Sequence, residues 1–139
     1  MKAWKVLLAF GMVLGLAETA SASGVDKCEP PAYNFVNQQV EIPSPGIQIS
    51  NTQPVNWIGY WVEVDFLYYD IDNYLVGGHD YDLNLGAVIK HTSVILPGPI
   101  FDTAGVVPGS AWCDVYLQIY DNLGVPVFAR FYAGRIAGW

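Results

Sequence analysis

Two segments of the sequence alternate apolar with mixed side chains so regularly that they predict β-strands. From residue 60 to residue 69 the even positions are apolar or aromatic, and the odd positions mix acidic, aromatic and apolar side chains. Residues 113–120 repeat the pattern, with one face made of Cys113, Val115, Leu117 and Ile119. Because successive side chains of a strand point to opposite faces, each segment has one face for a core and one for solvent.

The chain after residue 37 favours strands throughout. Further short strands are expected at 40–42, 47–49, 74–76, 81–89, 92–96 and 127–132. Residues 70–73 and 121–124 are turn sequences that predict hairpins, and the glycine- and proline-rich stretch 97–110 predicts a long loop. Strands with a turn about every ten residues predict an all-β fold, a small antiparallel β-sandwich of immunoglobulin-like architecture over residues 38–139. A small closed barrel is the alternative, because periodicity does not count sheets.

The N-terminal end has the features of a cleavable signal peptide. Lys2 and Lys5 precede an uncharged, mostly apolar run of eleven residues at 6–16, and Ala20-Ser21-Ala22 provides small residues for cleavage. This run is too short for a transmembrane helix, which needs about 20 apolar residues, and no later segment is long enough. We therefore expect a signal peptide at 1–22, an irregular leader at 23–37, no transmembrane segment, and export to the periplasm, the cell surface or the outside.

Cleavage after residue 22 leaves a strongly acidic chain. Four of the six basic and twelve of the thirteen acidic residues follow that position, which gives a net charge of −8. Proteins bind phosphate backbones through clustered lysine and arginine, so this charge excludes nucleic acid as a partner. The negative charge favours solubility.

Cys28 and Cys113 are the two cysteines of the chain. In an oxidising compartment such a pair is expected to form a disulfide, here tying the leader to a late strand. Closing a loop of about 85 residues would stabilise the fold by roughly 4–5 kcal/mol on the chain-entropy account. A reactive cysteine is the alternative, and it needs a basic neighbour to lower its pKa, a position that Lys27 beside Cys28 fills.

Acidic residues recur shortly after the strand at 60–69. Carboxylates at alternate positions are typical of calcium loops, so a weak Ca²⁺ site is a hypothesis for Asp70, Asp72, Asp80 and Asp82. The EF-hand template fails, because Leu85 and His91 stand where it requires glycine and glutamate. The competing interpretation, which we favour, is that these residues form turns and that the protein needs no cofactor.

The sequence offers little for catalysis, and we predict that the protein is not an enzyme. His79 and Asp80 are adjacent, so in a strand their side chains point to opposite faces. Glu63 and Asp65 share one face about 7 Å apart, a spacing that a glycosidase pair could use but that a solvated strand also produces.

If the strands at 60–69 and 113–120 pair, aromatic side chains gather on the solvent side of their sheet. These residues are Trp61, Tyr69, Trp112, Tyr116 and Tyr120, with Leu67 among them. Tryptophan and tyrosine anchor protein interfaces and also form platforms for sugar rings. We therefore expect an exported, non-catalytic module for protein interaction, self-association or surface assembly, with a carbohydrate-binding module as the alternative. A third interpretation is that the leader or the loop at 97–110 covers this face.

Overall fold

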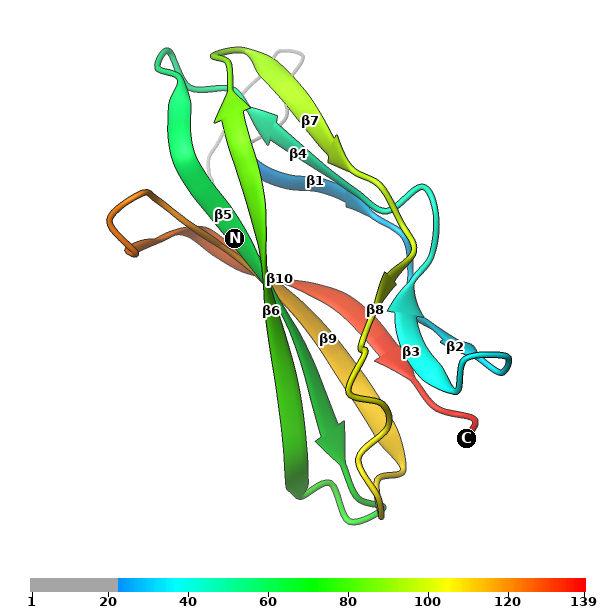
Figure 1. Cartoon of the computed structure of the whole chain (residues 1–139). Coiled ribbons are helices and arrows are strands. Elements are labelled where there is room, and N and C mark those ends of the chain that lie inside the picture. The colour runs from blue at the N-terminus through cyan, green and yellow to red at the C-terminus, as the bar shows by residue number, and fades with distance from the viewer. Residues whose placement is uncertain (1–22) are drawn as a thin grey trace, which may run out of the picture.

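The computed structural model describes residues 23–139, which form antiparallel strands in two layers, with no helix among them (Figure 1). No helix in this range is therefore long and apolar enough to cross a membrane. One layer is a four-stranded sheet of β5 (Trp57–Tyr69), β6 (Leu75–Val88), β9 (Trp112–Tyr120) and β10 (Pro126–Ile136), in the order β10-β9-β5-β6. The other layer holds two three-stranded sheets: β1 (Gly24–Cys28), β4 (Ile47–Asn51) and β7 (Thr92–Leu96), and β2 (Ala32–Asn34), β3 (Gln39–Ile42) and β8 (Ile100–Phe101).

The two alternating segments of the sequence are the central strands β5 and β9, which pair with each other. Their register runs from Trp61 opposite Tyr120 to Tyr69 opposite Trp112. The inner positions are almost completely buried: Val62, Val64, Phe66, Tyr68, Cys113, Val115, Leu117 and Ile119. The predicted hairpins at 70–73 and 121–124 connect β5 to β6 and β9 to β10. This arrangement confirms the all-β, sandwich-like fold.

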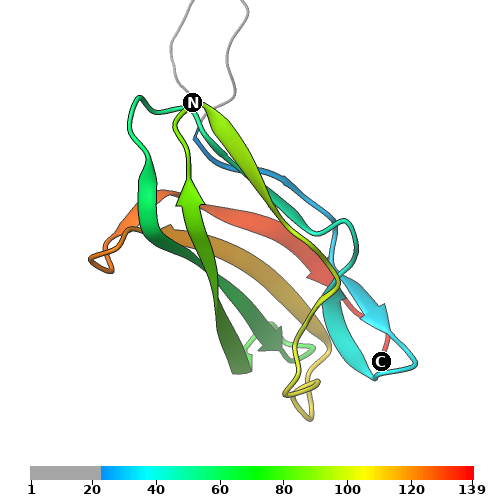
Figure 2. The same cartoon turned by 45° about the horizontal axis from the view of Figure 1, so that its top comes forward.

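The six strands of the second layer follow one another in three pairs, β1–β2, β3–β4 and β7–β8. A gap that contains prolines separates the two strands of each pair. Each gap, at 29–31, 43–46 and 97–99, contains two prolines, which lack the N–H that a ladder needs. The Glu29 amide donates to the Gly46 carbonyl (3.1 Å), and the Gly98 amide donates to the Pro45 carbonyl (3.2 Å). These bonds hold the three gaps side by side, so β1–β2, β3–β4 and β7–β8 each continue along one line (Figure 2).

The core lies between the two layers. Its largest fully buried side chains are Trp57, Tyr68 and Phe66, and full burial of a Phe-sized side chain stabilises by about 1.5–3 kcal/mol. The indole of Trp57 stacks on Tyr60 (centroids 5.1 Å apart) and donates its Nε1–H to Gln53 Oε1 at 3.0 Å. A large aromatic ring thus fills the core at the start of β5 with its polar atom satisfied.

The prediction of an irregular leader at 23–37 is wrong for most of that segment. Residues 24–28 form β1, which pairs with β4, and residues 32–34 form β2, which pairs with β3. The gap with Pro30 and Pro31 hid the pattern, because it divides one strand into two pieces too short to show periodicity. The predicted signal peptide at 1–22 lies outside the described residues.

The prediction of a disulfide between Cys28 and Cys113 is also wrong, because both thiols are free. Cys28 ends β1 in one layer, whereas Cys113 lies in β9 of the other layer, between Tyr68 and Ile136. Each sulfur contacts the carbonyl of the following residue rather than the other sulfur. Burial raises the pKa of Cys28 to about 11 and that of Cys113 to about 12, so neither is an activated thiol.

Candidate functional site

The pairing of β5 with β9 places all five predicted aromatic residues on the outer face of the four-stranded sheet. Trp61 lies opposite Tyr120, Tyr69 lies opposite Trp112, and Tyr116 lies opposite Asp65. All five are partly exposed. Sequence reasoning missed a sixth member, Tyr132 of β10, which lies opposite Tyr116 and is 49% exposed. These six residues are called the outer aromatic face below.

No other segment between residues 23 and 139 covers the outer aromatic face. The segment predicted as a leader forms β1 and β2, which belong to the opposite layer. Figure 1 shows no strand over the outer side of the four-stranded sheet. The loop after β8 also lies on the inner side, where Asp102 contacts Tyr68 and Tyr81. The interpretation that the leader or the loop buries this face is therefore wrong.

The rings of the outer aromatic face pack against neighbouring side chains. Trp61 and Tyr120 stack with centroids 5.5 Å apart, and Tyr116 lies 5.0 Å from Tyr132 in a tilted arrangement. Two guanidinium groups from β10 lie over rings: Arg130 over Tyr116 at 4.1 Å and Arg135 over Trp112 at 4.7 Å. One side of each of these rings is thus occupied from within the protein. Trp112 Nε1 is buried there without a hydrogen-bond partner among the described residues.

Carboxylates between the rings bind the hydroxyl and guanidinium groups. Asp114 accepts two hydrogen bonds from Arg135 (2.9 and 2.8 Å) and one from the Tyr132 hydroxyl (2.8 Å). The Arg135 guanidinium holds the pKa of Asp114 below its usual range, against the effect of its burial. Tyr120 donates to Glu63 Oε1 at 2.9 Å. These bonds fix several members of the outer aromatic face, which presents ordered aromatic, cationic and anionic groups.

The four aspartates of the calcium hypothesis do not form one cluster. Asp70 caps the β5–β6 turn, where its Oδ1 accepts hydrogen bonds from the amides of Asp72 and Tyr74. Asp80 and Asp82 lie in β6, opposite Asp65 and Glu63. Leu75 closes the turn, and Asp80 comes five residues later in β6. At the rise of a β-strand this separates Asp80 from the turn by roughly 17 Å. The interpretation of Asp70 as a turn former is confirmed.

A different acidic group forms across β5 and β6. Glu63, Asp65 and Asp80 place carboxylate oxygens within 4.8 Å of one another, the one such group of three among residues 23–139. Desolvation raises the pKa of Glu63, and the nearby Asp65 and Asp80 raise it further, against the Tyr120 hydrogen bond. Arg130 reaches Asp65 at 3.2 Å and neutralises part of this charge. The group is a strongly anionic patch beside the outer aromatic face.

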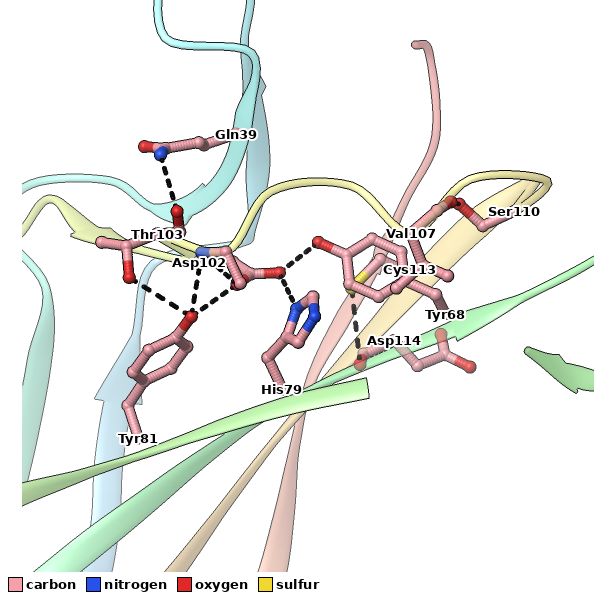
Figure 3. Close-up of polar contacts among 11 residues, drawn as sticks. Gln39, Tyr68, His79, Tyr81, Asp102, Thr103, Val107, Ser110, Cys113 and Asp114 are labelled. Atoms are coloured by element: carbon pink, nitrogen blue, oxygen red, sulfur yellow. Dashed lines mark hydrogen bonds and ion pairs between the residues drawn. The ribbon is translucent and has the colours of Figure 1, made fainter. Parts of the chain in front are cut away.

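A buried polar cluster on the inner face was not predicted. Figure 3 shows Tyr68, His79 and Tyr81 converging on Asp102, whose carboxylate accepts hydrogen bonds from both hydroxyls (2.6 and 2.7 Å) and contacts His79 Nδ1 at 2.8 Å. Asp102 is completely buried. Burial and the bond to Asp102 raise the pKa of Tyr68. The alternation of β5 predicts that Tyr68 faces the core. No local sequence pattern, however, predicts that Asp102, which follows β8, contacts Tyr68 there.

The Asp102 cluster anchors the loop that follows β8. The Asp102 amide donates to the Val40 carbonyl (2.8 Å), and its carboxylate accepts from the Ala104 amide (3.2 Å). Partners on β5, β6 and the loop satisfy both carboxylate oxygens, as burial of a charged group requires. His79 faces inward while Asp80 faces outward, so the adjacent pair does not meet, as the strand geometry predicted. We interpret this cluster as structural.

Comparisons with protein-family models, with curated proteins and with solved structures find no match for this chain. Function is therefore inferred from the residues and their geometry alone.

Proposed function

We propose that this protein is an exported, non-catalytic binding module that contacts a protein partner, or a second copy of itself, through the outer aromatic face. The observation that carries the proposal is the composition of an uncovered surface. Six aromatic residues and two arginines, Arg130 and Arg135, occupy the outer side of three adjacent strands. Tryptophan, tyrosine and arginine are the residue types that contribute most to binding at protein interfaces.

The order of this surface also supports an interface. Stacked rings and bound guanidinium groups lose little conformational freedom when a partner docks, so less free energy opposes binding. Asp114, Arg135 and Tyr132 already satisfy one another, which limits the cost of burying their polar atoms.

The alternative function, carbohydrate binding, has weaker support. A sugar ring packs on the open side of an aromatic ring. Here Trp61 and Tyr120 turn one side toward each other, and Arg130 and Arg135 lie over two further rings. Rings that are already covered on one side by other side chains favour a protein partner, whose side chains can pack between them, over a flat sugar ring.

Export is supported by the signal-peptide pattern at 1–22 and by the acidic composition, since net charge limits unspecific association. The immunoglobulin-like architecture remains part of the proposal, because the two-layer arrangement agrees with it only at the level of a sandwich.

Self-association is tested with the mature chain, residues 23–139, by native mass spectrometry and sedimentation. If the outer aromatic face is the contact, Tyr132→Ala dissociates an oligomer, whereas Tyr74→Ala leaves it intact. Tyr74 is the control, because it is 69% exposed but lies in the turn between β5 and β6 and is not one of the six residues of the outer aromatic face. An oligomer that survives Tyr132→Ala would contradict the proposed contact.

A monomer is then tested for the other ligands. A photo-crosslinking residue at position 132 should capture a protein in cells of the source organism, and one at position 74 should not. A shift of tryptophan fluorescence on titration with soluble polysaccharides would favour the carbohydrate alternative. A monomer that responds to neither would contradict a binding role for this face.

A further inference from the structure

Strand β6 forms one edge of the four-stranded sheet, and that edge is open. It stands last in the order β10-β9-β5-β6, and no strand among residues 23–139 pairs with its other side. Figures 1 and 2 both show β6 and β7 diverging from the turn that connects them. From residue 77 to residue 84 β6 pairs with β5 in unbroken register, so its free backbone groups form a regular row.

The opposite edge of the same sheet is protected. Strand β10 begins with Pro126, and its register with β9 shifts twice, between Val127 and Phe131 and between Tyr132 and Gly134. Pro31, in the gap between β1 and β2, packs against Gly134, where a Cβ would lie 3.0 Å from the proline ring. Proteins normally block edge strands with such prolines, bulges and covering segments, to prevent unwanted pairing. Strand β6 contains no proline and no lysine, and its centre has no bulge.

The charge beside the open edge selects the kind of strand that fits. Asp80 and Asp82 are exposed on the outer side of β6. In the register with β5 they lie opposite Asp65 and Glu63. Among residues 23–139, Arg130 is the only basic side chain that pairs with any of these four carboxylates. An added strand would place its outward side chains about 5 Å from Asp80 and Asp82, where opposite charges attract and like charges repel.

The inner side of β6 selects the alternate positions of the added strand. Between the acidic residues, the inward side chains of His79, Tyr81 and Leu83 are half-buried. Tyr81 and Leu83 pack against the core but are not fully buried, so each leaves part of its surface exposed. Apolar side chains at the inward positions of an added strand would cover this surface and extend the core.

We propose that the free edge of β6 binds an extended segment of another protein that alternates basic with apolar residues, which adds to the sheet as a fifth strand. The proposal rests on the proposed function, since it names a partner chemistry for the binding module, but it uses main-chain pairing at a separate edge. A second copy of this chain is disfavoured. Antiparallel pairing of two β6 strands about their centre would bring Asp80 and Asp82 of both copies together.

The test uses a fluorescent eight-residue peptide in which lysine alternates with valine, and the mature chain at physiological salt. Three comparisons separate strand addition from unspecific attraction to an acidic protein. The first peptide is N-methylated at every second residue, which keeps its charge but removes main-chain donors, and the second replaces lysine by glutamate. The third comparison sets Asp80→Asn/Asp82→Asn against Glu29→Gln/Asp72→Asn, which removes the same charge elsewhere.

We expect N-methylation to weaken binding at least about a hundredfold, because several ladder hydrogen bonds are lost. Asp80→Asn/Asp82→Asn should weaken binding about tenfold, the control pair less than about twofold, and the glutamate peptide should not bind. Hydrogen exchange should show new protection at the amides of residues 77–84. Equal binding of the N-methylated peptide, protection on another strand, or no binding of the lysine peptide would overturn the proposal. None of these results depends on the outer aromatic face. The proposed function is tested separately, by Tyr132→Ala, so the failure of one proposal can be told from the failure of the other.

Discussion

The indole ring of Trp61 and the phenol ring of Tyr120 stack across β5 and β9, with centroids 5.5 Å apart and planes inclined by 17°. They lie at the end of the register where β9 turns into β10, on a side of the sheet that no other layer covers. Cross-strand aromatic pairs stabilise a sheet beyond the area that they bury. The stacking therefore both stabilises the register and orders one end of the outer aromatic face.

A double-mutant cycle of Trp61→Ala and Tyr120→Ala, measured by urea unfolding, should give a coupling energy of about 0.5–1.5 kcal/mol. Tyr120→Phe keeps the ring and loses only the hydrogen bond to Glu63, so the cycle of Trp61→Ala with Tyr120→Phe should give little coupling. A coupling energy indistinguishable from zero with Tyr120→Ala, or one equally large with Tyr120→Phe, would show that stacking of the two rings does not stabilise the fold.

The raised pKa of Glu63 predicts a pH-dependent gain from Glu63→Gln. The folded protein binds a proton at Glu63 more readily than the unfolded chain, so the ionised side chain destabilises the fold above its folded pKa. As the pH falls through that value, protonation removes the cost. Glu63→Gln should therefore stabilise at pH 7 by about a few tenths of a kcal/mol, given solvent screening, and this gain should vanish in acid. Asp72→Asn in the exposed turn is the control, and an equal gain at every pH would contradict the mechanism.

The pKa of Asp114 is shifted in the opposite direction to that of Glu63, so its effect on stability also has the opposite pH dependence. Its pKa is lowered in the fold by Arg135, so its contribution to stability is present above the unfolded pKa and is lost as the pH falls through the folded pKa. Asp114→Asn should lower the melting temperature at pH 7 and have a much smaller effect near pH 2. Thermal unfolding monitored by circular dichroism across this range is the measurement. A deficit that is constant with pH would mean that Asp114 acts through packing rather than through its charge.

The free thiols predict that stability does not depend on reductant. Native mass should equal that of the reduced chain, and unfolding curves with and without dithiothreitol should coincide. Because burial raises the pKa of both cysteines, a thiol reagent at pH 7 should react slowly, with half-buried Cys28 before fully buried Cys113. A mass lower by two hydrogens, or stabilisation on oxidation, would reinstate the bridge.

The parts of the fold that the sequence predicted are those whose information is local. Alternation in β5 and β9 defined two faces, and the assumption that the strands pair was enough to place Trp61 and Tyr120 on the same outer side. The register that sets these two residues opposite each other is seen only in the structure. The hairpin turns likewise carry their own signal in Asp70 and Asp121, whose side chains bond the turn amides.

The parts that the sequence did not predict depend on contacts between distant segments. The prolines at 30 and 31 suggested irregular chain, whereas pairing with β3 and β4 overrides that preference. The cysteines suggested a bridge, because composition cannot show that they lie in different layers. Asp102 carries no local sign of burial, since its partners Tyr68, His79 and Tyr81 come from two other strands.

The Asp102 cluster predicts a graded loss of stability. Tyr68→Phe removes one donor and leaves the carboxylate its contacts with His79, Tyr81 and the Ala104 amide, so it should cost about 1–2 kcal/mol. Asp102→Ala deprives the buried Tyr68 hydroxyl of its acceptor and releases the loop, which should cost about 3 kcal/mol. Thr103→Ala, at the exposed neighbour, should stay within about 0.5 kcal/mol of the unsubstituted protein.

Urea unfolding gives these free energies, and hydrogen exchange locates the change. With Asp102→Ala the amides of Asp102 and Gly105, which bond within and across the loop, should exchange faster than those of β9. If Asp102→Ala unfolds the chain, Tyr68→Phe still measures the cluster, because it removes one hydroxyl and keeps the ring in the core. Losses below about 0.5 kcal/mol for both variants would mean that packing, rather than this carboxylate, holds the loop on the inner face of the sheet.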